Sequence, residues 1–378
     1  MRGSMRIGKI LGIPIWINYT WFIIFIFIVT TLALYYFPWY YPSSAPGSWS
    51  PLTYWGLGVA TSLLFFASLI VHELAHSIVC VRNGIPVKSI TLFIFGGIAR
   101  ISREATRPTT ELAMAAAGPL ASVAIAALFG GIWWLTRDTV EPLAAMAYYL
   151  ALINAILAAF NMIPGYPLDG GRMFRSIMWW KTGNYKKATH IASITGRGIG
   201  YLFIVGGIFI MFYFGYWVNG LWFAFIGWFL NNAASGGYRQ ALLREALQGF
   251  TARDLMIRDC PTVPPELTLR ELVQAHILYT GRLFFLVSDH GRLMGSLTLQ
   301  SIKAVPQERW DYTTVGQAMT PVKEMKLVHP ADEAVSVLER MNEEDIEQMP
   351  VVDGEQVVGL VTRDSLLHFI RIRSELGK

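Results

Sequence analysis

The sequence predicts a polytopic α-helical membrane protein of about six transmembrane helices with a small re-entrant β-stretch, followed by a soluble α/β part. Hydrophobic residues make up 53% of the 378 residues and charged residues only 15%, whereas charged residues are about 25% of a typical soluble domain. Apolar runs of membrane-spanning length recur through the first 240 residues. The remaining residues alternate short helical and strand patterns, and this pattern repeats once.

The charges divide the chain into the same two parts. Residues 1–240 hold 16 of the 31 Lys and Arg but only 6 of the 26 Asp and Glu, which leaves a net charge of +10. The remaining residues have a net charge of −5. A basic membrane part joined to an acidic soluble part explains the overall +5, so nucleic-acid binding is not needed to account for it. Cys80 and Cys260 fall in different parts and do not indicate a disulfide framework.

Six apolar runs are long enough to cross a bilayer, which takes about 20 helical residues. Between the second and third runs, residues 88–100 are too short and too rich in β-branched residues to span a membrane. The pair Gly96-Gly97 within this stretch indicates a turn or a hairpin. We place the six spans near residues 13–36, 53–81, 111–135, 143–163, 198–216 and 218–233.

Basic residues in the short loops predict how the spans are oriented, because Lys and Arg are enriched on the cytosolic side. The 37–52 loop carries no Lys or Arg, and the 136–142 loop carries one. The 82–110 segment carries five and the 170–197 segment carries six. We therefore expect a multi-pass protein of the cell membrane whose N-terminus and soluble part are cytosolic.

A short motif, His72-Glu73-Leu-Ala-His76, lies inside the second apolar run. Residues four apart share one face of a helix and lie about 6 Å apart along its axis, so His72 and His76 can share one metal ion. Glu73 can reach the position of a metal-bound water, which is the arrangement of a zinc hydrolase. Ionisable groups are costly in hydrocarbon, and this cost favours a functional site over a chance match.

A site of this kind needs a third protein ligand. Cys80 continues the same helix face but lies about 12 Å along the axis from His72, too far to share one ion. His190 falls in a basic segment that we expect at the surface. Asp169 is the only acid in residues 142–240, and it follows a Pro-Gly-x-Pro break that should end a helix. We expect Asp169 to be the third ligand; the alternative is an ordinary turn aspartate.

Two motifs in this order resemble the site-2 protease family of intramembrane metalloproteases. The first is His-Glu-Leu-Ala-His at 72–76, and the second is Asn-Met-Ile-Pro-Gly-Tyr-Pro-Leu-Asp-Gly-Gly-Arg at 161–172. The resemblance covers the whole membrane part. It implies one Zn²⁺ per chain, bound by His72, His76 and Asp169.

The same resemblance implies roles for two further residues. Glu73 would be the general base. Asn161 would help to hold the substrate or stabilise the oxyanion, although residue chemistry alone also allows an interhelical hydrogen bond.

The implied activity is hydrolysis of peptide bonds in or near transmembrane segments of membrane-bound substrates, that is, regulated intramembrane proteolysis in the lipid bilayer. A transmembrane helix satisfies its backbone groups internally, so it must be unwound before it is cut. We expect the strand-like stretch around 90–98 to pair with the unwound segment by strand addition. Phe95, Gly96 and Gly97 are then substrate-binding residues; the alternative is a hairpin that only shields the site.

The soluble part contains two copies of a unit of about 60 residues. Arg-Asp-Leu-Met at 253–256 is echoed by Gly-Gln-Ala-Met at 316–319, and Gly-Ser-Leu-Thr at 295–298 by Gly-Leu-Val-Thr at 359–362. This pair resembles a tandem of CBS domains, which one branch of the site-2 protease family carries. We expect an expression tag at 1–4, the protease domain at 5–235, a linker at 236–250, and CBS domains at 251–310 and 311–378.

Resemblance to CBS domains implies an adenine nucleotide and a homodimer as candidate ligand and partner. In the family pattern a Thr or Ser is followed three residues later by an Asp that holds the ribose. Here Thr298 is followed at that spacing by Ser301, and Thr362 by Ser365, with Asp364 one position short. Thr298, Thr362 and Asp364 are therefore candidate nucleotide residues, and a structural or dimerising module is the alternative.

Two rival functions remain for a membrane protein with a CBS pair. A CBS-regulated transporter or channel would carry inverted repeats and broken helices, but the six spans show no repeat. An inactive scaffold protein would need neither a complete set of metal ligands nor a general base. We therefore expect an intramembrane zinc metalloendopeptidase.

Overall fold

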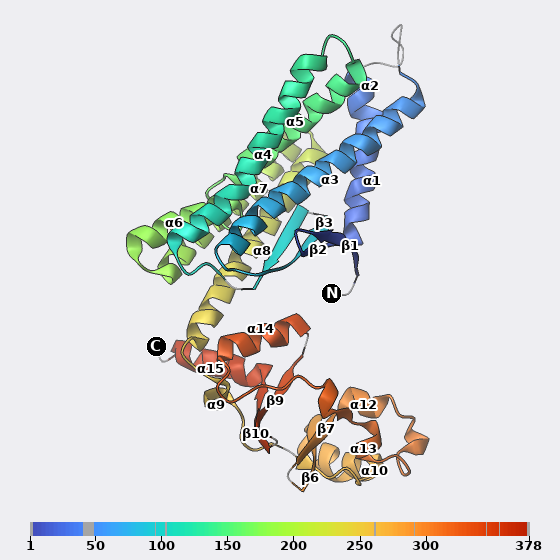
Figure 1. Cartoon of the computed structure of the whole chain (residues 1–378), viewed down its shortest axis with the longest axis vertical. Helices are drawn as coiled ribbons and strands as arrows, with labels where there is room; N and C mark the ends of the chain where they lie inside the picture. The colour runs from blue at the N-terminus through green and yellow to red at the C-terminus, as the bar shows by residue number, and fades with distance from the viewer. Residues whose placement is uncertain are drawn as a thin grey trace. The chain divides into compact units, whose positions relative to one another are not determined.

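The chain folds into two units, Met1–Arg239 and Gln240–Lys378. The first unit is a group of long helices with one small sheet, and the second mixes short helices and strands (Figure 1). The computed structural model describes residues 3–40, 49–94, 96–102, 104–260, 262–290, 292–344, 346–354 and 356–375.

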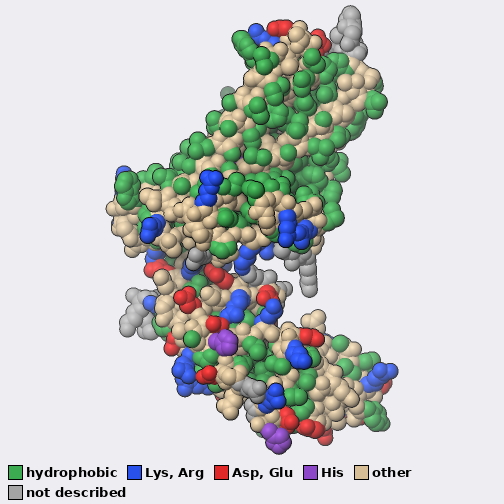
Figure 2. All heavy atoms as spheres, viewed as in Figure 1, with side chains coloured by type: hydrophobic (Ala, Val, Ile, Leu, Met, Phe, Trp, Pro, Cys, Tyr) green, Lys and Arg blue, Asp and Glu red, His purple; other side chains and the backbone are tan. Residues whose placement is uncertain are grey.

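Long apolar helices dominate the first unit, and hydrophobic side chains are spread over them in Figure 2. Apolar side chains on an exposed helix surface are what a bilayer requires. The helical segments are α1 (Thr20–Thr31), a π-helical stretch at Leu32–Tyr36, α2 (Phe37–Tyr40), α3 (Pro51–Arg82), α4 (Pro108–Thr136), α5 (Glu141–Asn161), α6 (Asp169–Thr182), α7 (Tyr185–Phe214) and α8 (Trp217–Leu247).

Five helical stretches of the described chain are long and apolar enough to cross a membrane, which confirms the prediction of a polytopic helical membrane protein. They are Thr20–Tyr40, Pro51–Arg82, Pro108–Thr136, Glu141–Asn161 and Tyr185–Tyr213.

The sixth expected span, 218–233, lies within α8. This helix is not among the five stretches that are long and apolar enough to cross a membrane. Three asparagines, Asn219, Asn231 and Asn232, lower its hydropathy. The helix also runs on to Leu247, so most of the linker expected at 236–250 is helical.

The first expected span begins too early in the sequence. Residues Ile13–Asn18 form a strand, β2, and the helical stretch starts only at Thr20. Every second residue of β2 is buried, namely Ile13, Ile15 and Ile17, which is the period of a strand. The intervening residues are also largely apolar, and this uniform hydropathy hides the strand in the sequence.

A four-stranded sheet accompanies the helices, in the order β1-β2-β3-β4. It consists of β1 (Ser4–Ile10), β2, β3 (Val87–Phe93) and β4 (Gly96–Ile101). The hairpin expected in residues 88–100 is confirmed, because β3 and β4 pair antiparallel. The central pair β2–β3 is parallel, so the sheet joins the N-terminal residues to this hairpin. β4 lies at one edge of the sheet and β1 at the other.

Glycines hold α7 and α8 close together. A Cβ added at Gly200 would lie 2.8 Å from the carbonyl oxygen of Gly227, and one added at Gly207 would lie 2.5 Å from that of Gly220. Small residues allow this approach of two backbones, which is a common way to pack helices in membranes. The two helices therefore form one close pair beside the helices that carry the predicted ligands.

The second unit is built on a sheet with the order β5-β6-β7-β10-β9, with β8 paired to β7. Its elements are α9 (Ala252–Leu255), β5 (Thr262–Val263), α10 (Leu269–Glu271), a π-helical stretch (Leu272–Ile277), α11 (Leu278–Thr280), β6 (Phe284–Asp289), β7 (Arg292–Thr298), α12 (Leu299–Lys303), a 3₁₀ turn (Gln307–Arg309), α13 (Val315–Ala318), β8 (Thr320–Pro321), a 3₁₀ turn (Val322–Glu324), α14 (Ala334–Glu344), β9 (Gln348–Asp353), β10 (Gln356–Thr362) and α15 (Arg363–Glu375).

The two repeats of this unit contact each other through residues that occupy equivalent positions in the two copies. A Cβ added at Gly359 would lie 2.5 Å from Sδ of Met256, and one at Gly295 would lie 2.9 Å from Sδ of Met319. The methionine of each copy thus packs on the glycine of the other. The repeated Met and Gly positions are therefore explained by packing between the copies.

Candidate metal centre

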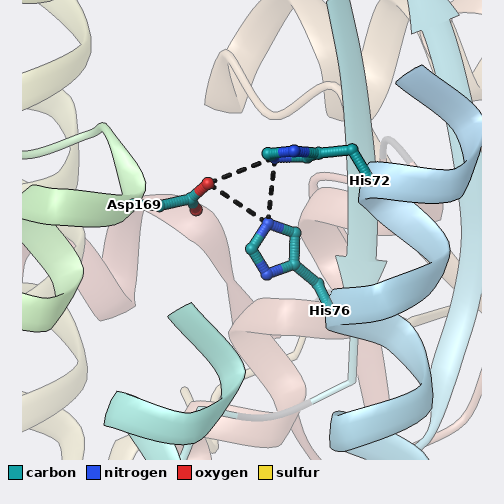
Figure 3. A group of neighbouring side chains, drawn as sticks. All are labelled: His72, His76 and Asp169. Atoms are coloured by element: carbon teal, nitrogen blue, oxygen red, sulfur yellow. Dashed lines mark hydrogen bonds and ion pairs between the residues drawn. The ribbon is translucent and has the colours of Figure 1, made fainter. Parts of the chain in front are cut away.

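Three of the predicted ligands meet in the first unit. His72 and His76 project from α3 toward Asp169, the first residue of α6 (Figure 3). Nε2 of each histidine lies 3.2 Å from Oδ2 of Asp169, and the two Nε2 atoms lie 3.2 Å from each other. The histidines are 3% and 7% exposed, and Asp169 is 9% exposed. One small, buried triangle of donor atoms results.

The second nitrogen of each histidine is held by α4. Nδ1 of His76 lies 2.6 Å from the carbonyl oxygen of Met114. Because a carbonyl oxygen only accepts, this nitrogen carries a proton, and Nε2 is then the atom that can bind a metal through its lone pair. Nδ1 of His72 lies 2.9 Å from Oγ of Ser122, which fixes the orientation of that ring. Such outer hydrogen bonds are typical of metal-binding histidines.

The donor atoms of the triangle need a positive charge among them. Nε2 of His76 lies 3.2 Å from the carboxylate oxygen of Asp169, and these two electron-rich atoms attract only through a proton on the imidazole or a metal ion between them. A tetrahedral zinc site with bonds of about 2.0 Å places neighbouring ligand atoms about 3.3 Å apart. The observed spacing therefore fits a zinc ion.

Gly118 of α4 keeps space open beside the histidine nitrogens. A Cβ at this position would lie 2.6 Å from Nε2 of His72 and would overlap Nε2 of His76. Any side chain here would occupy the place that a metal ion needs. The missing side chain and the spacing of the three donor atoms thus both fit a bound metal.

A tight turn places Asp169. Helix α5 ends at Asn161, and α6 begins at Asp169 after an extended Leu168. A Cβ at Gly170 would collide with the backbone of Met162, and one at Gly171 would collide with residues of the same turn. The Gly-Gly pair therefore lets the start of α6 lie directly on the turn. An aspartate in the first turn also interacts favourably with the helix dipole.

Glu73 lies between the triangle and the sheet. It follows His72 on α3 and is half-buried. A Cβ at Gly97 would lie 2.5 Å from Cγ of Glu73. The edge strand β4 therefore passes directly over this carboxylate, and only a glycine fits there.

The two other residues weighed as ligands, and one of the expected substrate residues, lie outside the triangle. Cys80 is buried in an apolar cluster with Ile85 and Met114, and His190 is exposed. Asn161 is the half-buried last residue of α5, and Phe95 lies outside the described residues.

Sequence reasoning did not identify Gly118 or Ser122 as site residues. The Gly118-Pro119 pair inside an apolar run was the available signal for the first. No feature of the sequence marked Ser122 as a site residue, because a single serine in a membrane helix is common.

In the second unit the three candidate nucleotide residues do not all line the same cavity. Thr298 lines a cavity of about 250 Å³ between the two repeats, together with residues such as Lys326 and Glu344. Its hydroxyl also accepts a hydrogen bond from the backbone N–H of Ser301. Thr362 makes the equivalent bond to Ser365, but neither Thr362 nor Asp364 lines this cavity.

A helical membrane unit with this donor set and an adjacent carboxylate defines a membrane-embedded metallohydrolase. The model of peptidase family M50 matches residues 60–138 and 136–206, and the CBS domain model matches 252–307 and 315–372. The zinc metalloprotease sll0528 of Synechocystis sp. is 35% identical over 97% of this chain and 95% of its own length. The chain therefore belongs to peptidase family M50.

Other similar proteins carry related names. The zinc metalloprotease Rip3 of Mycobacterium tuberculosis is 31% identical over 98% of this chain and 94% of its own length. A solved structure, the site-2 protease from Methanocaldococcus jannaschii, is 26% identical, covers 62% of this chain and 95% of its own, and has a TM-score of 0.43. The prediction of a site-2 protease-like zinc metalloprotease with two CBS domains is confirmed by the family and the full-length relatives.

Replacing Gly118 by alanine is expected to abolish metal binding, because the added methyl group would occupy the space beside both Nε2 atoms. Gly130→Ala is the matched control: it lies on the same helix, and a Cβ there would meet nothing within 4 Å. Elemental analysis of the purified proteins should give about one zinc per chain for wild type and Gly130→Ala, and close to none for Gly118→Ala. Full zinc occupancy in Gly118→Ala would contradict the assignment of this space to the metal.

Proposed function

We propose that the protein is an intramembrane zinc metalloendopeptidase that hydrolyses peptide bonds in or near transmembrane segments of membrane-bound substrates, in regulated intramembrane proteolysis. The supporting observation is the triangle of His72, His76 and Asp169, with atoms 3.2 Å apart beside the space that Gly118 leaves open. Two of its members come from α3, whose length and hydropathy suit a membrane span.

The chemistry is divided between the metal and the chain. A zinc ion held by the triangle supplies Lewis-acid chemistry, polarising a carbonyl oxygen and lowering the pKa of water. Glu73 accepts a proton from the attacking water and passes it to the leaving amine as the peptide C–N bond breaks. Asn161, at the end of α5, is proposed to hold the substrate or donate to the developing oxyanion.

Edge strand β4 is the proposed binding place for the unwound substrate. A strand at a sheet edge presents unpaired backbone groups, which an extended peptide can pair with. β4 is such an edge, and its Gly97 lies against Glu73. A peptide paired with β4 would therefore run close to the general base. Gly96 and Gly97 are the proposed contact residues, together with Phe95 as a prediction from the sequence.

The orientation proposed from the loop charges puts the N-terminus and the CBS pair in the cytosol. It requires an even number of membrane crossings, so α8 would be the sixth span beside the five apolar stretches. Close packing of α8 on α7 through glycines is consistent with a membrane helix.

The CBS pair is proposed to regulate the protease, with the cavity at Thr298 as its ligand site and an adenine nucleotide as the ligand class. The cavity lies between the two repeats, so a ligand there would contact both and could change their relative arrangement. The CBS pair is also the proposed contact of a homodimer, which the mass of the purified protein in solution tests directly.

Glu73→Gln is expected to abolish cleavage of a co-expressed membrane substrate while zinc stays bound, because the amide cannot accept the proton but is not a ligand. His76→Ala and Asp169→Ala should lose both zinc and cleavage. Immunoblotting of the substrate and elemental analysis of the purified variants measure the two quantities. Cleavage by Glu73→Gln at the wild-type rate would show that the proposed general base is wrong.

A cysteine crosslink tests the substrate-binding strand. In a Glu73→Gln background lacking Cys80 and Cys260, Ile98→Cys on β4 should form a disulfide with a cysteine placed near the scissile bond of the substrate. Ile7→Cys on β1 is the matched control, since Ile7 and Ile98 are 50% and 51% exposed on opposite edges of one sheet. Equal crosslinking at both positions would contradict substrate pairing at β4.

ATP or AMP is expected to raise the unfolding temperature of the protein, and Thr298→Val should remove this rise. Thr362→Val is the control, because Thr362 makes the same hydrogen bond to the start of its helix but does not line the cavity. Each variant is compared with and without nucleotide, so that the loss of the helix cap cancels. A wild-type protein whose unfolding temperature no nucleotide changes would rule out the nucleotide site.

Single cysteines in a cysteine-free variant test the orientation. Cysteines placed at the 136–142 loop should react with a membrane-impermeant maleimide in whole cells, whereas those in the CBS pair should react only after lysis. The reverse pattern would show that the proposed orientation is wrong.

A further inference from the structure

A buried ion pair joins α6, which begins with Asp169, to α4, whose Met114 and Ser122 contact the two histidines. Arg175 of α6 is 5% exposed and Glu111 of α4 is 1% exposed. Nε of Arg175 donates to Oε1 of Glu111 at 2.8 Å, and Nη2 donates to the same oxygen. Oε2 of Glu111 is also buried, with no hydrogen-bond partner in the described part of the chain. The pair is therefore withdrawn from water without being fully satisfied.

Such a pair is a poor way to gain stability. Removing two charges from water costs several kcal/mol per ion, and well-packed apolar residues often stabilise a protein as well or better. A buried pair of this kind can instead fix a geometry. An arginine side chain suits that role, because its planar group binds in a defined direction and stacks on aromatic rings.

Arg175 contacts the turn that leads to Asp169. The centre of its guanidinium group lies 5.3 Å from the ring centre of Tyr166 and 5.0 Å from that of Tyr185, distances at which a cation attracts an aromatic face. Tyr166 belongs to the turn between α5 and α6, and Tyr185 is the first residue of α7. One side chain thus ties the turn and α7 to α6 and, through Glu111, to α4.

The turn between α5 and α6 is also closely packed against α7 and α8. A Cβ at Gly196 of α7 would collide with the carbonyl group of Tyr166, and one at Gly237 of α8 would lie 2.7 Å from Cζ of its ring. Tyr166 is therefore held by the α7–α8 pair as well as by Arg175.

Glu111 lies on the part of α4 that supports the histidines. Met114, whose carbonyl oxygen binds His76, follows it by three residues, and Gly118 follows by seven. These spacings place all three on one face of the helix. The ion pair therefore connects the helix that orients the histidines to the helix that begins with Asp169.

We propose that Arg175 is a positioning residue for the metal site: through Glu111 and Tyr166 it sets the place of Asp169 opposite the two histidines. This inference rests on the proposed zinc site. It assigns a role in metal affinity to a residue that touches neither the metal ligands nor the substrate.

Arg175→Lys tests this role, because lysine keeps the charge but loses the forked donor and the stacking surface. We expect zinc affinity, measured by chelator competition, to fall about 10-fold or more, the range typical of outer hydrogen-bond partners of metal ligands. The unfolding temperature of the zinc-free protein should stay close to that of wild type. Arg137→Lys is the matched control: Arg137 also lies against an aromatic ring, Trp134, and pairs with an acid, Asp138, but at the far end of α4.

The outcomes separate this inference from the proposed function. If wild type binds no zinc, or His76→Ala binds it as tightly, the proposed metal site fails. If wild type binds zinc and Arg175→Lys has the same affinity, only the positioning role is overturned.

A second variant covers the case in which Arg175→Lys does not fold. Tyr166→Leu leaves the ion pair intact and removes the ring beneath the arginine, so zinc affinity should again fall. Unchanged affinity in Tyr166→Leu, or failure of this variant to fold as well, would overturn the proposal, because the arginine would then serve folding alone.

Discussion

The close approach of His72, His76 and Asp169 is the constraint on which the rest of the membrane unit depends. Two imidazole nitrogens and a carboxylate oxygen lie 3.2 Å from one another, and such electron-rich atoms stay together through shared protons, a bound metal ion or restraint from the fold. The carbonyl of Met114 and the hydroxyl of Ser122 restrain the histidines. The fold therefore holds the three donor groups in place when the metal is not bound.

Close backbone packing provides much of that restraint. Gly118 leaves the space beside the histidines, Gly97 brings β4 onto Glu73, and Gly170 lets α6 begin directly on the turn. Each of these glycines removes a side chain where two elements must approach, and this explains why they cannot be replaced without moving the site. Arg175 and Glu111 add a directional contact between α6, which begins with Asp169, and α4, which orients the histidines.

Much of the candidate site could be predicted from the sequence, because its signals are local or compositional. The spacing of His72 and His76 follows from helix geometry, and Asp169 stood out in a segment that otherwise lacks acids. Gly118 and Arg175 could not be assigned in this way, since their roles depend on which helices pack together. The strand β2 was missed because its apolar residues, flanked by an apolar helix, conceal the alternation that the structure shows. The two CBS repeats were evident from their spacing, but the exchange of Met256 and Met319 between them required the fold.

X-ray absorption at the zinc edge of the purified protein tests the metal site most directly. A zinc ion bound by His72, His76 and Asp169 should show a first shell of nitrogen and oxygen atoms at about 2.0–2.1 Å, with the outer scattering of two imidazole rings and no sulfur. Asp169→Ala should lose the metal or alter this shell, whereas Cys80→Ser should leave it unchanged. A sulfur atom at about 2.3 Å, or a spectrum unaffected by Asp169→Ala, would contradict the proposed site.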